Sequence, residues 1–162
     1  ALNNSMALLF KHYEGHAYFG VQVETRLAPM LDLFLTFDTV TVQWYHVSAQ
    51  LGERTEQDSV ALADPDGFTW GRTTDWYANE LRWDNSKMQA LMAAGLPQGE
   101  AFQAAVYPAD GIEFQFLRSK FTAPVGLLRI EIATPPDYES PVVYPPGTVR
   151  FNRDGWAPIV FE

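Results

Sequence analysis

Alternating apolar and polar residues predict β-strands through the first third of the chain. Residues 16–25 alternate with a period of two, as expected of a half-buried strand. Residues 31–37 alternate as well, although Pro29 could instead open a helix there. Residues 40–47 are β-branched and aromatic, which favours a third strand, and Asp38-Thr39 either turns the chain or interrupts one longer strand. Residues 6–13 are apolar and short, and fit either a helix or a strand.

The period changes in the middle of the chain. Residues 52–67 are polar and end in Asp64-Pro-Asp-Gly67, a turn sequence in which proline fixes one dihedral and glycine accepts positive φ. Residues 75–83 predict a short helix. A second helix begins after Asp84 or Ser86 and ends at Gly95, and residues 98–105 add a further helical turn. The pattern therefore predicts a helical insert at about 74–105.

The last third returns to strands. Residues 112–120 alternate, and residues 125–134 are more continuously apolar. The Pro-rich segment 135–162 follows, and proline confines strands to sheet edges or bulges. We predict short edge strands at 142–144, 148–151 and 159–161, with a hairpin turn at Asn152-Arg-Asp-Gly155.

Strands segregated from helices indicate an α+β fold. We expect a mainly antiparallel curved sheet or partly open barrel, wrapped on the mid-chain helical insert. The sequence contains no repeat or long linker, so residues 1–162 are predicted to form a single domain. One interpretation of the start of the chain is that residues 1–5 are a cloning remnant before an internal start at Met6.

The charge balance narrows the range of partners. Twenty acidic residues against 11 basic residues give a formal net charge of −9. Binding to phosphates depends on clustered Lys and Arg, so nucleic acid and anionic membranes are disfavoured as partners. The charge suits simple solubility, and it also suits electrostatic steering toward a basic protein. The remaining expected partners are a small molecule and further copies of the same chain.

The absence of cysteine excludes disulfides, thiolate catalysis and cysteine-based zinc sites. No apolar run reaches the roughly 18 residues of a membrane span, and no signal peptide is visible. The expected localisation is cytoplasmic, and no cofactor is expected.

The sequence contains several candidate catalytic or metal-binding side chains, but no motif that defines one reaction. His12 and His16 have the spacing that places two imidazoles on one helical face, and His46 could complete a zinc site. Gly15 and the strand pattern at residue 16 argue against that site. No serine lies in Gly-x-Ser-x-Gly. Glu113 and Glu131 could face inward as an acid and base, although we expect both to face solvent.

The segment 68–84 carries three of the five tryptophans. On a helix from residue 75, Trp76 and Trp83 share a face and could join the helix to the sheet. Aromatic platforms with nearby arginines suit a sugar, an aromatic metabolite or a protein hot spot. The candidate binding residues are the rim of this helix: Trp70, Arg72, Tyr77 and Arg82.

These observations favour a small acidic binding or interaction protein that uses an aromatic-rich surface or pocket and forms homo-oligomers. One alternative is a metal-independent enzyme of the isomerase, cyclase or hydrolase type, with Glu113, Glu131, His46 and Tyr45 as candidate acids and bases. Another alternative is an acidic inhibitor or immunity-type protein that binds a basic partner. No residue is predicted to be catalytic, and the enzyme alternative is the less favoured.

Overall fold

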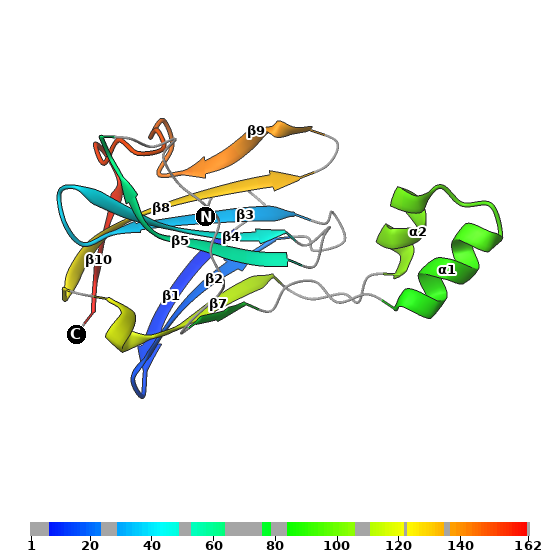
Figure 1. Ribbon diagram of the computed structural model, residues 1–162, viewed down its shortest axis with the longest axis horizontal. Coiled ribbons are helices and arrows are strands. Elements are labelled where there is room, and N and C mark those ends of the chain that lie inside the picture. Colours follow the sequence, from blue (N-terminus) through cyan, green and yellow to red (C-terminus); the bar gives the residue numbers. More distant parts are fainter. Residues whose placement is uncertain are drawn as a thin grey trace.

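A computed structural model describes most of the chain (Figure 1). The described residues are 7–23, 29–48, 53–63, 76–78, 84–105, 111–121, 123–134 and 137–161, without the side chains of 53–59 and 137. Antiparallel strands dominate, accompanied by two helices, so the expectation of a mainly antiparallel protein with a helical insert is confirmed. Among the described residues, no helix is long and apolar enough to cross a membrane.

Two antiparallel sheets pack face to face. The smaller sheet has the order β1 (Ala7–Tyr13), β2 (His16–Gln22), β7 (Ile112–Leu117) and β6 (Trp76–Ala78). The larger sheet has the order β10 (Ala157–Val160), β8 (Val125–Thr134), β3 (Met30–Thr36), β4 (Thr41–Ser48) and β5 (Glu53–Ala61). A sixth strand, β9 (Asp137–Tyr144), pairs with β8 beyond the end of β10, so two strands share one edge of β8.

The main core lies between the two sheets. The alternating residues of β2, β7 and β6 face those of β3, β4 and β8, and Phe121 and Phe161, whose rings stack on each other, belong to the same core. Tyr45 is fully buried, and its ring packs against Trp76 and Phe116 with centroids 5.4 and 4.7 Å apart. The strands therefore form two stacked sheets that are not closed into a barrel, and the predicted curved antiparallel sheet is compatible with this arrangement.

The predicted helix over 75–83 is wrong where the structure describes that segment. Trp76, Tyr77 and Ala78 form strand β6, and Trp76 pairs with Phe116 of β7. Trp76 and Ala78 face the core while Tyr77 faces outward, which is the period of a strand. Pairing with β7 and burial in the core override the local helical pattern.

The two predicted later helices are present as α1 (Asn85–Ala93) and α2 (Gln98–Ala105). Asp84 caps α1, since its carboxylate accepts the N–H of Lys87 at 2.9 Å. The helices lie beyond the strand ends rather than on a sheet face (Figure 1), so the sheet does not wrap around them as predicted. The second sheet supplies the apolar cover that the helices were expected to give.

Several smaller predictions can also be compared with the structure. Residues 7–13 and 30–36 are strands, and β5 is a strand that the polar pattern of 52–67 did not predict. Residues 148–151 are not an edge strand, because Val149 bridges Asn152 across a turn instead. The turn sequence at 64–67 lies outside the described residues.

Candidate functional site

The outer face of the larger sheet carries charged residues in the middle of its strands. Asp32 on β3 lies opposite His46 on β4 and opposite Glu131 on β8. One pair further along, Phe34 lies opposite Trp44 and Arg129. Two neighbouring rows of side chains across three strands thus combine carboxylates, imidazole, guanidinium and aromatic rings on one face.

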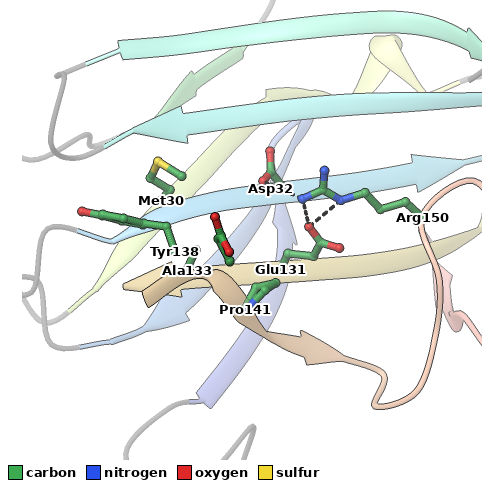
Figure 2. Close-up of a pocket in the computed structure, with 8 residues that line it drawn as sticks. Met30, Asp32, Glu131, Ala133, Tyr138, Pro141 and Arg150 are labelled. Carbon is green, nitrogen blue, oxygen red and sulfur yellow. Dashed lines mark hydrogen bonds and ion pairs between the residues drawn. The ribbon is translucent and has the colours of Figure 1, made fainter. Parts of the chain in front are cut away.

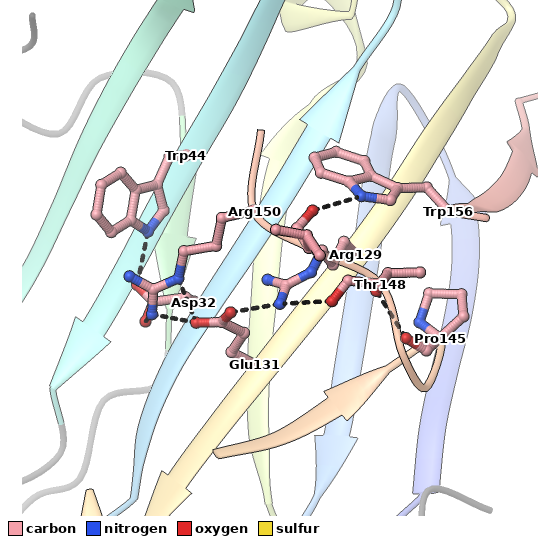
Figure 3. Close-up of polar contacts among 9 residues, drawn as sticks. Asp32, Trp44, Arg129, Glu131, Pro145, Thr148, Arg150 and Trp156 are labelled. Carbon is pink, nitrogen blue, oxygen red and sulfur yellow. Dashed lines mark hydrogen bonds and ion pairs between the residues drawn. The ribbon is translucent and has the colours of Figure 1, made fainter. Parts of the chain in front are cut away.

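A surface segment covers these rows. We call residues 145–156, between β9 and β10, the strap (Figure 3). Phe151 and Trp156 of the strap pack with Phe34 and Trp44 in a second apolar cluster, separate from the main core. The indole N–H of Trp156 donates to the carbonyl of Val149 at 3.2 Å, which holds the strap in its folded-over form. The face under the strap is therefore largely closed to solvent.

Five charged or titratable side chains form what we call the charged network: Asp32, His46, Arg129, Glu131 and Arg150. Figure 3 shows four of them, Asp32, Arg129, Glu131 and Arg150. Asp32 Oδ1 accepts the Trp44 indole N–H at 2.6 Å and lies 2.8 Å from His46 Nδ1. Glu131 Oε1 lies 2.5 Å from Arg129 Nη2, and its Oε2 accepts Arg150 Nε–H at 2.6 Å. Arg150 Nη2 also contacts Glu131 and lies 3.7 Å from Asp32 Oδ2.

Burial affects the two arginines differently. Arg129 is almost fully buried, and burial lowers the pKa of its guanidinium while the charge of Glu131 opposes that shift. Its Nε and Nη1 have no hydrogen-bond partner among the described residues. The Arg150 side chain stays 43% exposed, and its hydrogen bond to Glu131 raises its pKa. Among the arginines of the charged network, Arg150 is thus the one with a solvent-exposed side chain, and its contact with Glu131 stabilises its charged form.

A pocket of about 370 Å³ opens beside the charged network (Figure 2). Figure 2 shows Met30 and Tyr138 at one end of the pocket and Glu131 and Arg150 at the other. The lining residues come from β3, β8, the start of β9 and the strap: Met30, Asp32, Glu131, Ala133, Tyr138, Glu139, Pro141 and Arg150. Three carboxylates therefore face one guanidinium, together with the phenol ring of Tyr138, whose pKa burial raises.

The residues predicted as a binding rim are only partly placed by the structure. Trp70, Arg72 and Arg82 lie outside the described residues, as does Trp83. Tyr77 is 40% exposed on β6, in the smaller sheet, and does not line the pocket. The prediction for the rim stays a prediction. Trp76 takes the alternative role of a core side chain, although as part of a strand rather than a helix.

The predicted acids and bases separate into two groups. Glu131 lines the pocket, and His46 contacts its neighbour Asp32. Glu131 is buried, contrary to the expectation that it faces solvent, because two arginines neutralise it. Glu113 is exposed on the smaller sheet as expected, and Tyr45 is buried in the main core.

The three histidines do not converge. His12 and His16 lie on the two strands of a hairpin whose two-residue turn, Glu14-Gly15, has positive φ at both positions, so the helical spacing does not apply. Within the described ranges, no group of three or more histidine or carboxylate side chains is arranged to hold a metal ion.

Sequence reasoning missed Asp32, Arg129 and Arg150. Charged residues that alternate with apolar ones in a strand ordinarily indicate a solvated face. The signal that could have identified the site is that Phe34 and Trp44 share that same face, because two adjacent aromatic rings on a solvated face require a cover.

Comparisons with protein-family models, with curated proteins and with solved structures found no match.

Proposed function

We propose that this chain is a non-enzymatic binding protein whose pocket beside the charged network recognises a small cationic group. The observation that carries the proposal is the lining of the pocket, in which three carboxylates, Asp32, Glu131 and Glu139, accompany Arg150. Arg129 also pairs with Glu131 from behind the lining, so the three carboxylates exceed the two guanidinium groups by one negative charge. Low-dielectric walls strengthen the attraction of a cation by such an excess of carboxylates. The net charge of −9 favours the same class of ligand at long range.

The shape of the pocket also supports a ligand rather than a solid structural interior. Its volume of about 370 Å³ falls within the usual range for small-molecule sites. Met30, Ala133 and Pro141 provide apolar walls for the body of a ligand, and the Tyr138 ring offers a surface for cation–π contact. The cationic group could equally be the side chain of a Lys or Arg on a basic protein, which retains the alternative of an acidic inhibitor.

Titration with matched small molecules tests the proposal. Ethylguanidinium and n-propylammonium are the cationic probes, n-propanol is the neutral control and propionate is the anionic control. We expect saturable binding of the two cations and no binding of the two controls. The chemical-shift changes in ¹H–¹⁵N correlation NMR spectra measure this binding. Binding should weaken in Glu139→Gln, at the exposed rim of the pocket, and persist in Glu113→Gln, an exposed carboxylate of the smaller sheet. Preferential binding of propionate, or no binding of either cation, would overturn the proposal.

A second candidate is the small metal-independent enzyme. His46 Nδ1 lies 2.8 Å from Asp32 Oδ1, and Asp32 and Glu131 both line the pocket. Such a group could hold and transfer protons in a hydrolysis or an isomerisation. Turnover of a panel of nitrophenyl esters and glycosides that disappears in His46→Gln would favour this candidate. Cation binding without turnover would favour the binding protein.

Homo-oligomerisation remains part of the proposal. The edge strand β1 presents Leu9 and Tyr13 to solvent on one face, with Leu9 63% exposed. Exposed apolar residues on a sheet edge favour pairing with another chain. Light scattering after size-exclusion chromatography should show an oligomer that Leu9→Lys dissociates. Val40→Lys, at an equally exposed valine in the β3–β4 turn, should leave the oligomer intact.

A further inference from the structure

The side chain of Arg150 occupies a place built for a cation. Its guanidinium carbon lies 5.7 Å from the centroid of the Phe34 ring and 5.6 Å from that of Trp44. Two nitrogens of the Arg150 guanidinium, Nε and Nη2, contact the Glu131 carboxylate, and the Asp32 carboxylate lies beside the same guanidinium. Aromatic rings combined with carboxylates are the usual recognition elements for guanidinium groups.

The location of Arg150 differs from that of a purely structural buried arginine. Arg129 supplies a buried partner for Glu131 from within the sheet, whereas Arg150 reaches the same carboxylate from a surface strap. Arg150 is 43% exposed and also lines the pocket, so a ligand entering the pocket meets its guanidinium directly. Displacement would carry a side chain that is already 43% exposed further into solvent, and the ligand's own guanidinium would replace its contacts with Glu131 and the two rings.

We propose that Arg150 is an internal occupant of a guanidinium-recognition site formed by Phe34, Trp44, Asp32 and Glu131, and that a guanidinium-bearing ligand binds by displacing it. This inference rests on the proposed function, because it assigns the class of cation and the group with which the ligand competes. The strap then sets the affinity of the site, since the ligand binds only the fraction of molecules in which Arg150 has left.

Removing the internal occupant should therefore tighten binding. In Arg150→Met, which keeps an unbranched apolar stem, we expect the Kd for ethylguanidinium to fall about tenfold or more relative to the unmodified chain. Arg150→Gln should give the same direction of change. The matched control is Arg153→Gln, since Arg153 also lies in the strap but donates to the backbone carbonyl of Asp38 outside the pocket.

The indole N–H of Trp44 provides a local spectroscopic signal, because it donates to Asp32 within the site. Its ¹H–¹⁵N resonance should shift on addition of ethylguanidinium, and the shift should saturate with the same Kd. The dispersion of the remaining indole and amide resonances shows at the same time whether each variant is folded. If one substitution of Arg150 unfolds the chain, the other supplies the comparison.

The outcomes separate the two proposals. Tighter binding in both Arg150 variants, with Arg153→Gln unchanged, supports the internal occupant. Equal or weaker binding in the variants, while the unmodified chain still binds cations, overturns the internal occupant and leaves the proposed function standing. Failure of every form of the chain to bind either cation overturns both. Binding of propionate that requires Arg150 would show that the arginine recognises an anionic ligand instead.

Discussion

At the scale of single residues, Trp76 and Tyr77 are adjacent in sequence yet face opposite sides of β6. Trp76 is 8% exposed and stacks on Phe114 and Phe116 in the main core. Tyr77 points away from the core. This pair separates the two roles that an aromatic side chain in this segment can have.

Substitution of these neighbours should have unequal effects on folding. We expect Trp76→Ala to lower the free energy of unfolding by about 3–5 kcal/mol, because the deletion leaves a cavity between the sheets. Tyr77→Ala should change it by about 1 kcal/mol or less. Urea denaturation followed by circular dichroism measures both. Similar losses for the two variants would show that the inward and outward assignments are wrong.

Glu131 is the residue on which the charged network depends, because both of its oxygens neutralise an arginine. Glu131→Gln removes the negative charge while Arg129 stays buried. We therefore expect a loss of about 3–5 kcal/mol in the free energy of unfolding, as for other broken buried ion pairs. Glu113→Gln, on the exposed face of the smaller sheet, should change stability by about 0.5 kcal/mol or less. Equal effects in denaturant titrations would contradict the assigned burial of Glu131.

At the scale of elements, the turn between β3 and β4 depends on Asp38. One oxygen of its carboxylate accepts the N–H groups of Val40 and Thr41 at 2.8 and 2.7 Å, and the other accepts the Thr41 hydroxyl at 2.6 Å. The hydroxyl bond is the leading cause of a pKa below the usual value of 3.8 for this carboxyl. Of the two alternatives for Asp38-Thr39, the structure shows the turn, because β3 and β4 are antiparallel neighbours. The hydrogen bonds of the turn favour the ionised carboxylate of Asp38.

A lowered folded-state pKa contributes stability that is present above the ordinary pKa and is lost as the pH falls through the folded value. The chain should therefore lose part of its stability in acid through Asp38. In Asp38→Asn the midpoint of urea unfolding should fall less steeply between about pH 5 and pH 2.5. Asp154→Asn, at an exposed carboxylate of the strap, is the control. If the unfolding midpoint of Asp38→Asn falls with pH as steeply as that of the unmodified chain, Asp38 does not contribute to the acid dependence of stability.

At the scale of the whole molecule, the helices interrupt the connection between two paired strands. β6 and β7 are antiparallel neighbours, and α1 and α2 lie between them in sequence. The backbone N–H of Asp84 donates to the carbonyl of Ala105 at 3.0 Å, so the two ends of the helical pair are adjacent. The helical pair is in effect an enlarged hairpin loop.

Replacement of residues 85–104 by a short Gly-Ser linker should therefore preserve the stacked sheets. We expect the free energy of unfolding to change by less than about 2 kcal/mol, since loop length has a weak effect on stability and the helical pair contributes only Phe102 and the partly buried Met88 to the described main core. The helical component of the circular dichroism spectrum should disappear while amide dispersion from the strands remains. Loss of cooperative unfolding would show that the helices are required by the sheets.

The alternation of apolar and polar residues was sufficient to locate most strands, because the residues of a half-buried strand that face the core are apolar at every second position. It failed at β5, where polar residues occupy a strand whose pairing is set by β4, and at β6, where a three-residue strand is too short to show a period. The candidate site could not be predicted as a whole. Arg150 is 19 residues beyond Glu131 in a Pro-rich segment, and no local pattern brings a surface segment back over β8.

The two strands that share one edge of β8 give the chain an order of assembly during synthesis. Arg129 and Glu131 leave the ribosome before Arg150 and before β10, which pairs with residues 125–128. Until then the nascent chain carries an uncovered edge at residues 125–128 and an incompletely neutralised carboxylate, so we expect the larger sheet to be complete only after residues 157–160 have emerged. Arrested nascent chains that expose residues 1–147 should remain open to protease at β8, and those that expose residues 1–161 should resist it.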